Sequence, residues 1–247
     1  MIQLLYITMT TFTIALIAFV GVFALVMKEQ LLNKILIILV SLSAGVLMGS
    51  AFIHLLPEAI ETAEGSDIFT FVLVGFVLFF ILEKLLHWRH CHNGKCDVHV
   101  FHYMNLIGDS IHNFIDGLII AASFIVSIPL GITTTIAIAA HEIPQEIGDF
   151  GVLIYGGFKR KRAVILNFIV ALTVVIGGIV GYFISKSIEN TVVFLLPFAA
   201  GGFIYIAATD LIPEIKKEID IRKSMLTMGV FILGMLIMWL TKITFHG

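Results

Sequence analysis

The segment His112-Asn113-Phe114-Ile115-Asp116-Gly117 lies inside an apolar run over residues 101–126. A second polar segment, His141-Glu142-Ile143-Pro144-Gln145-Glu146-Ile147-Gly148-Asp149, lies inside the next apolar run, over 131–156. Each run is long enough to cross a bilayer, which takes about 20 residues. Imidazole, amide and carboxylate groups are costly in hydrocarbon, so their presence there marks a functional site by default. The two segments therefore predict membrane-spanning helices that carry a polar site.

The composition of the whole chain agrees with this prediction. Of its 247 residues, 59% are hydrophobic and 13% are charged, and the mean hydropathy is +1.06. A soluble domain averages about 45–50% apolar and about 25% charged residues. The connections between apolar runs are short, without a Ser/Pro-rich linker. We expect one integral membrane domain over residues 1–247, without a cleavable signal.

Apolar segments follow one another along nearly the whole chain. We expect eight transmembrane helices at about 4–27, 35–56, 68–88, 101–126, 131–156, 163–185, 191–212 and 224–245. Each is predicted to be helical because hydrocarbon offers no hydrogen-bond partner to a backbone group. The predicted fold class is an all-α membrane protein.

The basic residues predict the orientation of these helices. All Lys and Arg residues except Lys186 and Lys242 lie in the loops after spans 1, 3, 5 and 7. Cytoplasmic loops carry an excess of Lys and Arg, so both termini are expected outside the cytoplasmic (plasma) membrane. The acidic loop after span 2 would then face outward, either as a collector of cations or as an ordinary solvated loop.

An internal similarity relates two of the predicted spans. The segment from Ala44 to Glu58 resembles the segment from Ala200 to Glu214, including the sequence Leu/Ile-Pro-Glu at the end of each. Their spans would cross the membrane in opposite directions, as in the inverted repeats of secondary transporters. Spans 1–3 would correspond to spans 6–8, which leaves spans 4 and 5 as a central pair in a 3+2+3 arrangement.

Helical spacing brings the polar groups of spans 4 and 5 onto shared faces. His112 and Asp116 are four residues apart, as are His141 and Gln145, so each pair lies on one side of its helix. Imidazole favours zinc, iron, copper or nickel, while carboxylate and amide oxygens also suit manganese. Hydrogen bonding between helices is the alternative role for these groups. Their density on two neighbouring helices favours a metal site, because buried charge is costly.

The motifs HNFIDG and HEIPQEIGD resemble the signature of the ZIP family of divalent-metal transporters, and most closely the branch whose fifth helix reads HExPHExGD. This resemblance extends over the whole chain. It implies a 3+2+3 helix arrangement and no enzymatic activity. It also implies that the protein transports divalent cations into the cytoplasm, with Zn²⁺ as the main substrate and Fe²⁺, Mn²⁺ or Cd²⁺ as further substrates. By motif position it implies that the metal ligands are His112, Asn113, Asp116, His141, Glu142, Gln145 and Glu146.

The chain departs from the family pattern at two places. Gln145 stands where the branch has a second histidine, which replaces a nitrogen ligand by a weaker amide oxygen and relaxes the preference for zinc. Span 6 has no carboxylate, and its one strongly polar residue is Asn167, so a second metal site would be incomplete.

Further polar residues predict a path and a loop site. The expected entrance and exit residues are His54, Glu58, Asp109, Asp149, Asp210 and Glu214, with interfacial capping as the alternative for the residues at the span ends. Between spans 3 and 4 lie His87, His90, Cys91, His92, Cys96, His99 and His102. Such a composition is typical of metal binding. The loop would accept or sense metal on the exit side, or bind metal without a role in transport.

Two other functions fit parts of the sequence. His141-Glu142 begins the H-E-x-x-H motif of zinc metalloproteases, but Gln145 occupies the position of the second histidine. A metal sensor without flux is the other alternative. The expected partners are metal ions and the lipid bilayer, with a homodimer as an open option and no nucleic acid.

Overall fold

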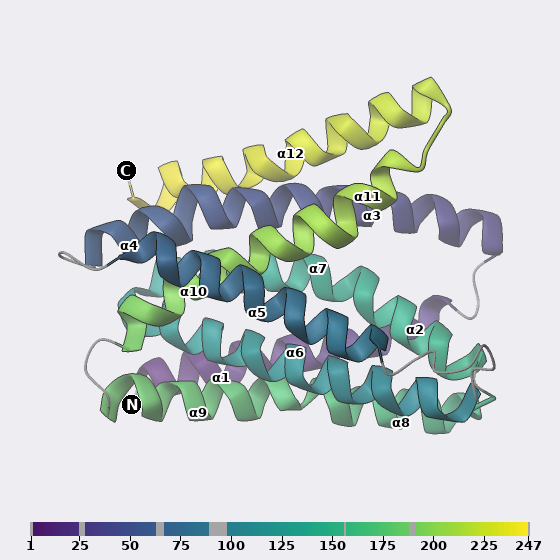
Figure 1. Ribbon diagram of the computed structural model, residues 1–247, viewed down its shortest axis with the longest axis horizontal. Helices are drawn as coiled ribbons and strands as arrows, with labels where there is room; N and C mark the ends of the chain where they lie inside the picture. The colour runs from purple at the N-terminus through teal and green to yellow at the C-terminus, as the bar shows by residue number, and fades with distance from the viewer. Residues whose placement is uncertain are drawn as a thin grey trace.

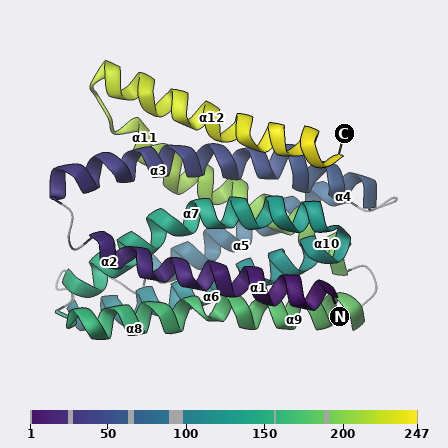
Figure 2. The ribbon, with the colours of Figure 1, turned by 180° about the vertical axis from the view of Figure 1, so that it is seen from behind.

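The protein is all-α in a computed structural model that describes residues 2–24, 28–62, 67–88, 98–155, 157–187 and 191–246, where every regular element is a helix. The all-α part of the predicted fold class is thereby confirmed. Long helices run roughly along one axis and form an elongated bundle (Figures 1 and 2).

Some consecutive helical elements join end to end, and each continuous helical stretch is called a rod below. The elements are α1 (Ile2–Ala15), the 3₁₀ turn η1 (Leu16–Phe19), α2 (Val20–Ala24), α3 (Glu29–Gly49), the π-helix η2 (Ser50–Leu55), α4 (Leu56–Thr62), α5 (Ile68–Trp88), α6 (Val98–Val126), α7 (Ile128–Tyr155), α8 (Arg160–Ala171), α9 (Thr173–Ser187), α10 (Thr191–Ile206), the π-helix η3 (Ala207–Leu211), α11 (Ile212–Lys216) and α12 (Ile221–His246).

Six rods in the described part of the chain are long and apolar enough to cross a membrane. They cover Ile2–Val22, Lys34–Glu61, Leu106–Val126, Arg160–Ser187, Thr191–Lys216 and Ile221–Thr244. The chain is thus an integral, multi-pass membrane protein. Helices α5 and α7, which match the predicted spans 68–88 and 131–156, are not among the six, so the count of eight spans stays a prediction.

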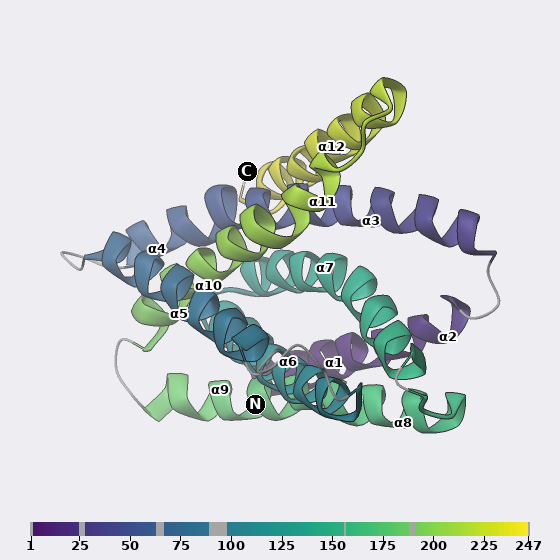
Figure 3. The same cartoon turned by 45° about the vertical axis from the view of Figure 1, so that its right-hand side comes forward.

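Helix packing divides the rods into two groups. In one group α9 packs against α6 and α1, and α7 packs against α6 and α2. In the other, α3 packs against α12, and α5 packs against α10. Helix α7 also packs against α3 and so joins the groups. Figure 3 shows α12 along the outer side of α3, with α8 and α9 on the opposite side of the molecule.

The backbone repeats the similarity found in the sequence. Each of the two similar segments contains a π-helix, η2 and η3, directly before its Leu/Ile-Pro-Glu sequence. A β-carbon built on Gly45 would lie 2.0 Å from the carbonyl oxygen of Phe231 on α12, and one on Gly201 would lie 2.0 Å from that of Val72 on α5. Corresponding glycines therefore allow the same close approach of a neighbouring helix, as an internal repeat predicts.

Candidate metal site

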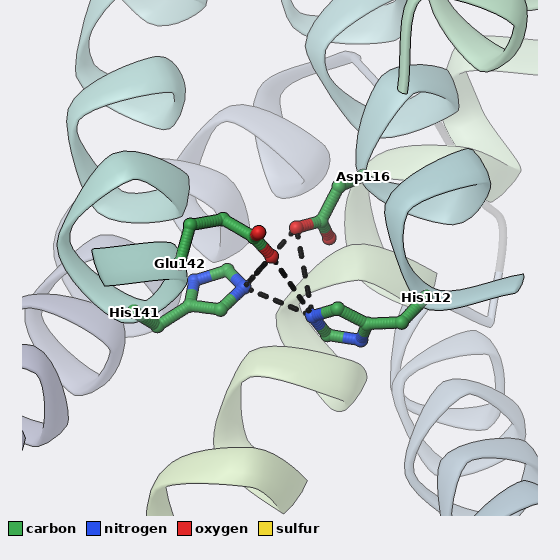
Figure 4. Close-up of side chains that lie close together, drawn as sticks. All are labelled: His112, Asp116, His141 and Glu142. Carbon is green, nitrogen blue, oxygen red and sulfur yellow. Dashed lines mark hydrogen bonds and ion pairs between the residues drawn. The ribbon is translucent and has the colours of Figure 1, made fainter. Parts of the chain in front are cut away.

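Helices α6 and α7 lie side by side and carry the two polar segments toward each other (Figure 4). Helix α7 continues through Pro144, whose ring nitrogen donates no hydrogen bond to the carbonyl of Ala140 one turn earlier. The hydroxyl of Ser43 on α3 donates to this carbonyl instead. A carbonyl that is partly shielded from solvent is costly to leave without a partner, so Ser43 both compensates for the proline and ties α7 to α3.

The side chains of His112 and Asp116 from α6 meet those of His141 and Glu142 from α7, and these residues are called the four-ligand cluster below. The Nε2 atoms of the two histidines are 3.1 Å apart. Asp116 Oδ2 lies 3.1 Å from Nε2 of His141 and 3.7 Å from that of His112. Glu142 Oε1 lies 3.4 Å from Nε2 of His112 and 3.6 Å from that of His141. All four ligand atoms lie within 4.8 Å of one another.

These distances fit a small tetrahedral cation. Zinc lies about 2.0–2.2 Å from histidine nitrogen and carboxylate oxygen, so ligand atoms around it are about 3.3–3.6 Å apart. The five distances above, from 3.1 to 3.7 Å, scatter around that range. Two imidazoles and two carboxylates would also balance the double positive charge of the ion. A divalent cation can therefore sit among these four atoms without a large movement of the side chains.

One histidine is held in the tautomer that metal binding needs. Nδ1 of His141 lies 3.2 Å from the carbonyl oxygen of Ala137. A carbonyl only accepts hydrogen bonds, so this nitrogen donates, and the lone pair of a neutral His141 ring is on Nε2. Hydrogen bonds of this kind orient metal-binding histidines and raise their basicity. Helix α7 thus aims His141 into the four-ligand cluster.

The cluster is shielded from the surroundings. Asp116, His141 and Glu142 are each at most 2% exposed, and Oδ1 of Asp116 has no hydrogen-bond partner among the residues that the structure describes. Phe79 of α5 meets the His112 ring edge-on at 6.2 Å, and Phe203 of α10 meets the His141 ring at 6.1 Å. Buried carboxylates need a compensating charge, and a cation bound between them supplies it.

A second polar layer lies one turn away and contains three of the predicted ligands. Asp109 Oδ1 accepts hydrogen bonds from the amide nitrogen of Gln145, at 2.9 Å, and from that of Asn113, at 2.8 Å. Glu146 accepts one from Asn167 of α8. The structure therefore places Asn113, Gln145 and Glu146 beside the four-ligand cluster.

Of the predicted path residues, Asp109 belongs to the second polar layer, and the other five are not part of the four-ligand cluster. His54 is buried, and its Nε2 is 2.9 Å from the carbonyl oxygen of Met238 and 3.1 Å from the hydroxyl of Thr241 on α12. Asp210 on η3 is exposed and accepts a hydrogen bond from Thr209. Glu58 lies on α4, Asp149 on α7 and Glu214 on α11. Their roles along a path stay predictions, and the contacts of His54 favour helix packing.

The predicted loop site falls largely outside the described residues. His90, Cys91, His92 and Cys96 are not described, while His87 belongs to α5 and His99 and His102 belong to α6. Metal binding by this loop stays a prediction.

Sequence reasoning missed three residues around the site, namely Ser43, Phe79 and Phe203. A hydrogen-bond donor such as Ser43 could have been expected from the sequence, because Pro144 leaves a backbone carbonyl on its helix without its usual donor. No signal marks Phe79 or Phe203 among the 21 phenylalanines of the chain.

Comparison with known proteins finds relatives along nearly the whole chain. A family model described as ZIP zinc transporter matches residues 2–99 and 92–242. Zinc transporter ZIP13 of Mus musculus is 34% identical over 254 residues, which cover 83% of this chain and 69% of that protein. Zinc transporter ZIP13 of Pongo abelii is 36% identical, with 81% of this chain and 65% of that protein covered. The chain spans about two thirds of the length of these relatives.

Proposed function

Because the chain belongs to the ZIP zinc transporter family, we propose that it carries divalent transition-metal cations across the membrane through the four-ligand cluster. The observation that supports this most directly is the geometry of the four-ligand cluster, in which five of the six distances between ligand atoms lie between 3.1 and 3.7 Å. The cluster lies on membrane helices. A catalytic metal at this position would need a path by which a substrate molecule could reach it, whereas a transported metal ion needs only a path for the ion to each side of the membrane.

Zinc is the proposed main substrate, with Fe²⁺, Mn²⁺ and Cd²⁺ as competitors. Two imidazoles suit zinc and iron, and two carboxylates keep manganese within reach. Gln145 is engaged by Asp109 and adds no nitrogen to the cluster, which supports a broad selectivity.

The proposed route runs from the outer face to the cytoplasm of the plasma membrane through eight spans in a 3+2+3 arrangement with both termini outside. The ion would enter near His54 and Glu58, bind the cluster, and leave past the second polar layer toward Asp149, Asp210 and Glu214. Asp109, Asn113, Gln145 and Glu146 form that layer directly beside the cluster and would pass the ion on. Alternating access would move α6, α7 and their partners against the group formed by α3, α5, α10 and α12.

Reconstituted vesicles loaded with a zinc-sensitive dye test the proposal. Wild-type protein is expected to take up Zn²⁺, and excess unlabelled Fe²⁺, Mn²⁺ or Cd²⁺ to reduce the rate. His141→Ala is expected to abolish uptake while the purified variant keeps the elution profile of the wild type. Full uptake by a folded His141→Ala variant would overturn the proposed site.

The exposed variant Lys186→Ala serves as the matched control, because it removes a polar side chain far from the cluster. Deleting residues 89–99 separates transport from sensing. A transporter keeps much of its zinc flux after the deletion, whereas loss of all activity would favour the sensor.

A further inference from the structure

Helices α3 and α12 diverge toward their first residues, so that a wedge opens between them at one end of the molecule (Figures 1 and 3). Helix α11 lies beside this opening. The three helices line a cavity of about 730 Å³, called the α3–α12 wedge below. Its size matches sites that hold small organic molecules, which occupy about 300–1,000 Å³.

The rim of the wedge carries more positive than negative charge. Its basic residues are Lys34, Lys217, Arg222 and Lys223, and its acidic residues are Glu214 and Glu218. Lys217 pairs with Glu214, and Lys223 pairs with Glu218 at 3.6 Å. Lys34 and Arg222 take part in no ion pair within the described ranges. Two cations therefore remain for a ligand.

The floor of the wedge is apolar. Ile37 and Ile38 of α3 and Leu226 of α12 line it, and Leu226 is 50% exposed. The cavity thus has a polar rim and an apolar interior, as an amphipathic ligand requires.

The wedge also lies at the boundary between membrane and water. Lys34, Lys216 and Ile221 are the terminal residues of three membrane-length ranges. The wedge brings these ends together, because Lys34, Lys217 and Arg222 line the same cavity. This end carries the basic loops, which marks the cytoplasmic side by the positive-inside rule. The cytoplasmic leaflet is the one that contains anionic lipids, and basic pockets between membrane helices bind their head groups.

We propose that the α3–α12 wedge binds one anionic glycerophospholipid. Its phosphate lies between Lys34 and Arg222, and an acyl chain follows Ile38 and Leu226 between the two helices. A soluble phosphate would contact the basic residues of the wedge but would leave its apolar residues without a partner. This site is separate from the four-ligand cluster and stands whether or not the chain transports metal.

Native mass spectrometry of the full chain in detergent tests the proposal. The protein is mixed with equal amounts of dioleoyl phosphatidylglycerol and dioleoyl phosphatidylcholine, and retained lipid is counted. Wild-type protein is expected to retain one phosphatidylglycerol in preference. Each charge near a membrane surface changes lipid binding about fivefold, so Lys34→Gln with Arg222→Gln should weaken retention roughly 25-fold.

The control variant Arg160→Gln with Lys161→Gln removes two exposed charges at the same end of the molecule but outside the wedge. It is expected to retain the lipid, and Lys34→Arg is expected to do so as well. An equal loss in the control would overturn the proposal in favour of a general surface attraction. Displacement of the lipid by glycerol phosphate at the same concentration would overturn it in favour of a free-anion site. A dimer that buries the wedge and excludes lipid would also overturn it.

Discussion

Acidification should weaken metal uptake, and the steepness of this pH dependence should show how many histidines bind the ion. Nε2 of His112 and Nε2 of His141 are 3.1 Å apart and both face the carboxylates of the cluster. Each nitrogen must be unprotonated to bind a metal. The second nitrogen of His141 donates to the carbonyl of Ala137, so Nε2 is its only position for a ligand. Protons and metal therefore compete for the same two atoms.

The size of this effect follows from the number of protons that the metal must displace. Where one nitrogen carries a proton in the absence of metal, the apparent affinity falls about tenfold for each pH unit of acidification, and where two nitrogens do, it falls about 100-fold. The two Nε2 atoms are 3.1 Å apart, so one ion bound between them displaces the protons of both.

The assay is initial zinc uptake into vesicles with the same pH on both sides, at metal concentrations that define the apparent KM. Toward pH 5, the logarithm of the apparent KM should rise by more than one and up to about two per pH unit in the wild type, because each bound ion displaces up to two protons. In His112→Ala, with one imidazole left, it should rise by about one. Saturating zinc should restore much of the rate. A flat profile down to pH 5, or the same slope in His112→Ala, would refute direct ligation by both histidines.

Three further predictions concern the residues that support the site. Ser43→Ala should lower the free energy of unfolding by about 1–3 kcal/mol, because the carbonyl of Ala140 loses its donor; an unchanged thermal midpoint would contradict this. Gly117→Ala should reduce the yield of folded protein, because the new β-carbon would lie 2.1 Å from the carbonyl oxygen of Val174; wild-type yield in fluorescence-detected gel filtration would contradict it. Phe79→Ala should raise the apparent KM for zinc by up to about tenfold and leave the number of bound ions unchanged, because the ring makes only an aromatic edge contact with a ligand; loss of the ion in elemental analysis would count against this.

The core of the site was predictable from the sequence because helical periodicity and the bilayer act together. Spacing of four residues places His112 and Asp116 on one face of α6, and the cost of buried charge requires a partner for them. The structure brings them together with His141 and Glu142, and metal binding by these four side chains stays a prediction. The all-helical fold was predictable for the same reason, since hydrocarbon leaves the backbone no other partner.

The rest depended on side-chain conformations that periodicity does not encode. Gln145 lies one turn from His141, so the two were expected to face the same ion. In the structure the Gln145 amide donates to Asp109 instead, because a carboxylate on the neighbouring helix offers a charged acceptor at 2.9 Å. Phe79 and Phe203 belong to helices that are distant in sequence, and their contact with the histidines arises only from tertiary packing.

The internal repeat shows why the site belongs to α6 and α7. In the similar segments, His54 and Asp210 occupy corresponding positions, each within a π-helix. Such insertions are common where function requires a departure from the regular helix. Yet His54 is buried against α12, whereas Asp210 is exposed. The two segments therefore have similar backbone conformations, but their corresponding polar side chains lie in different environments. A pair that differs in this way cannot form one symmetric site. In the described residues, only α6 and α7 bring two histidines and two carboxylates within 4.8 Å of one another.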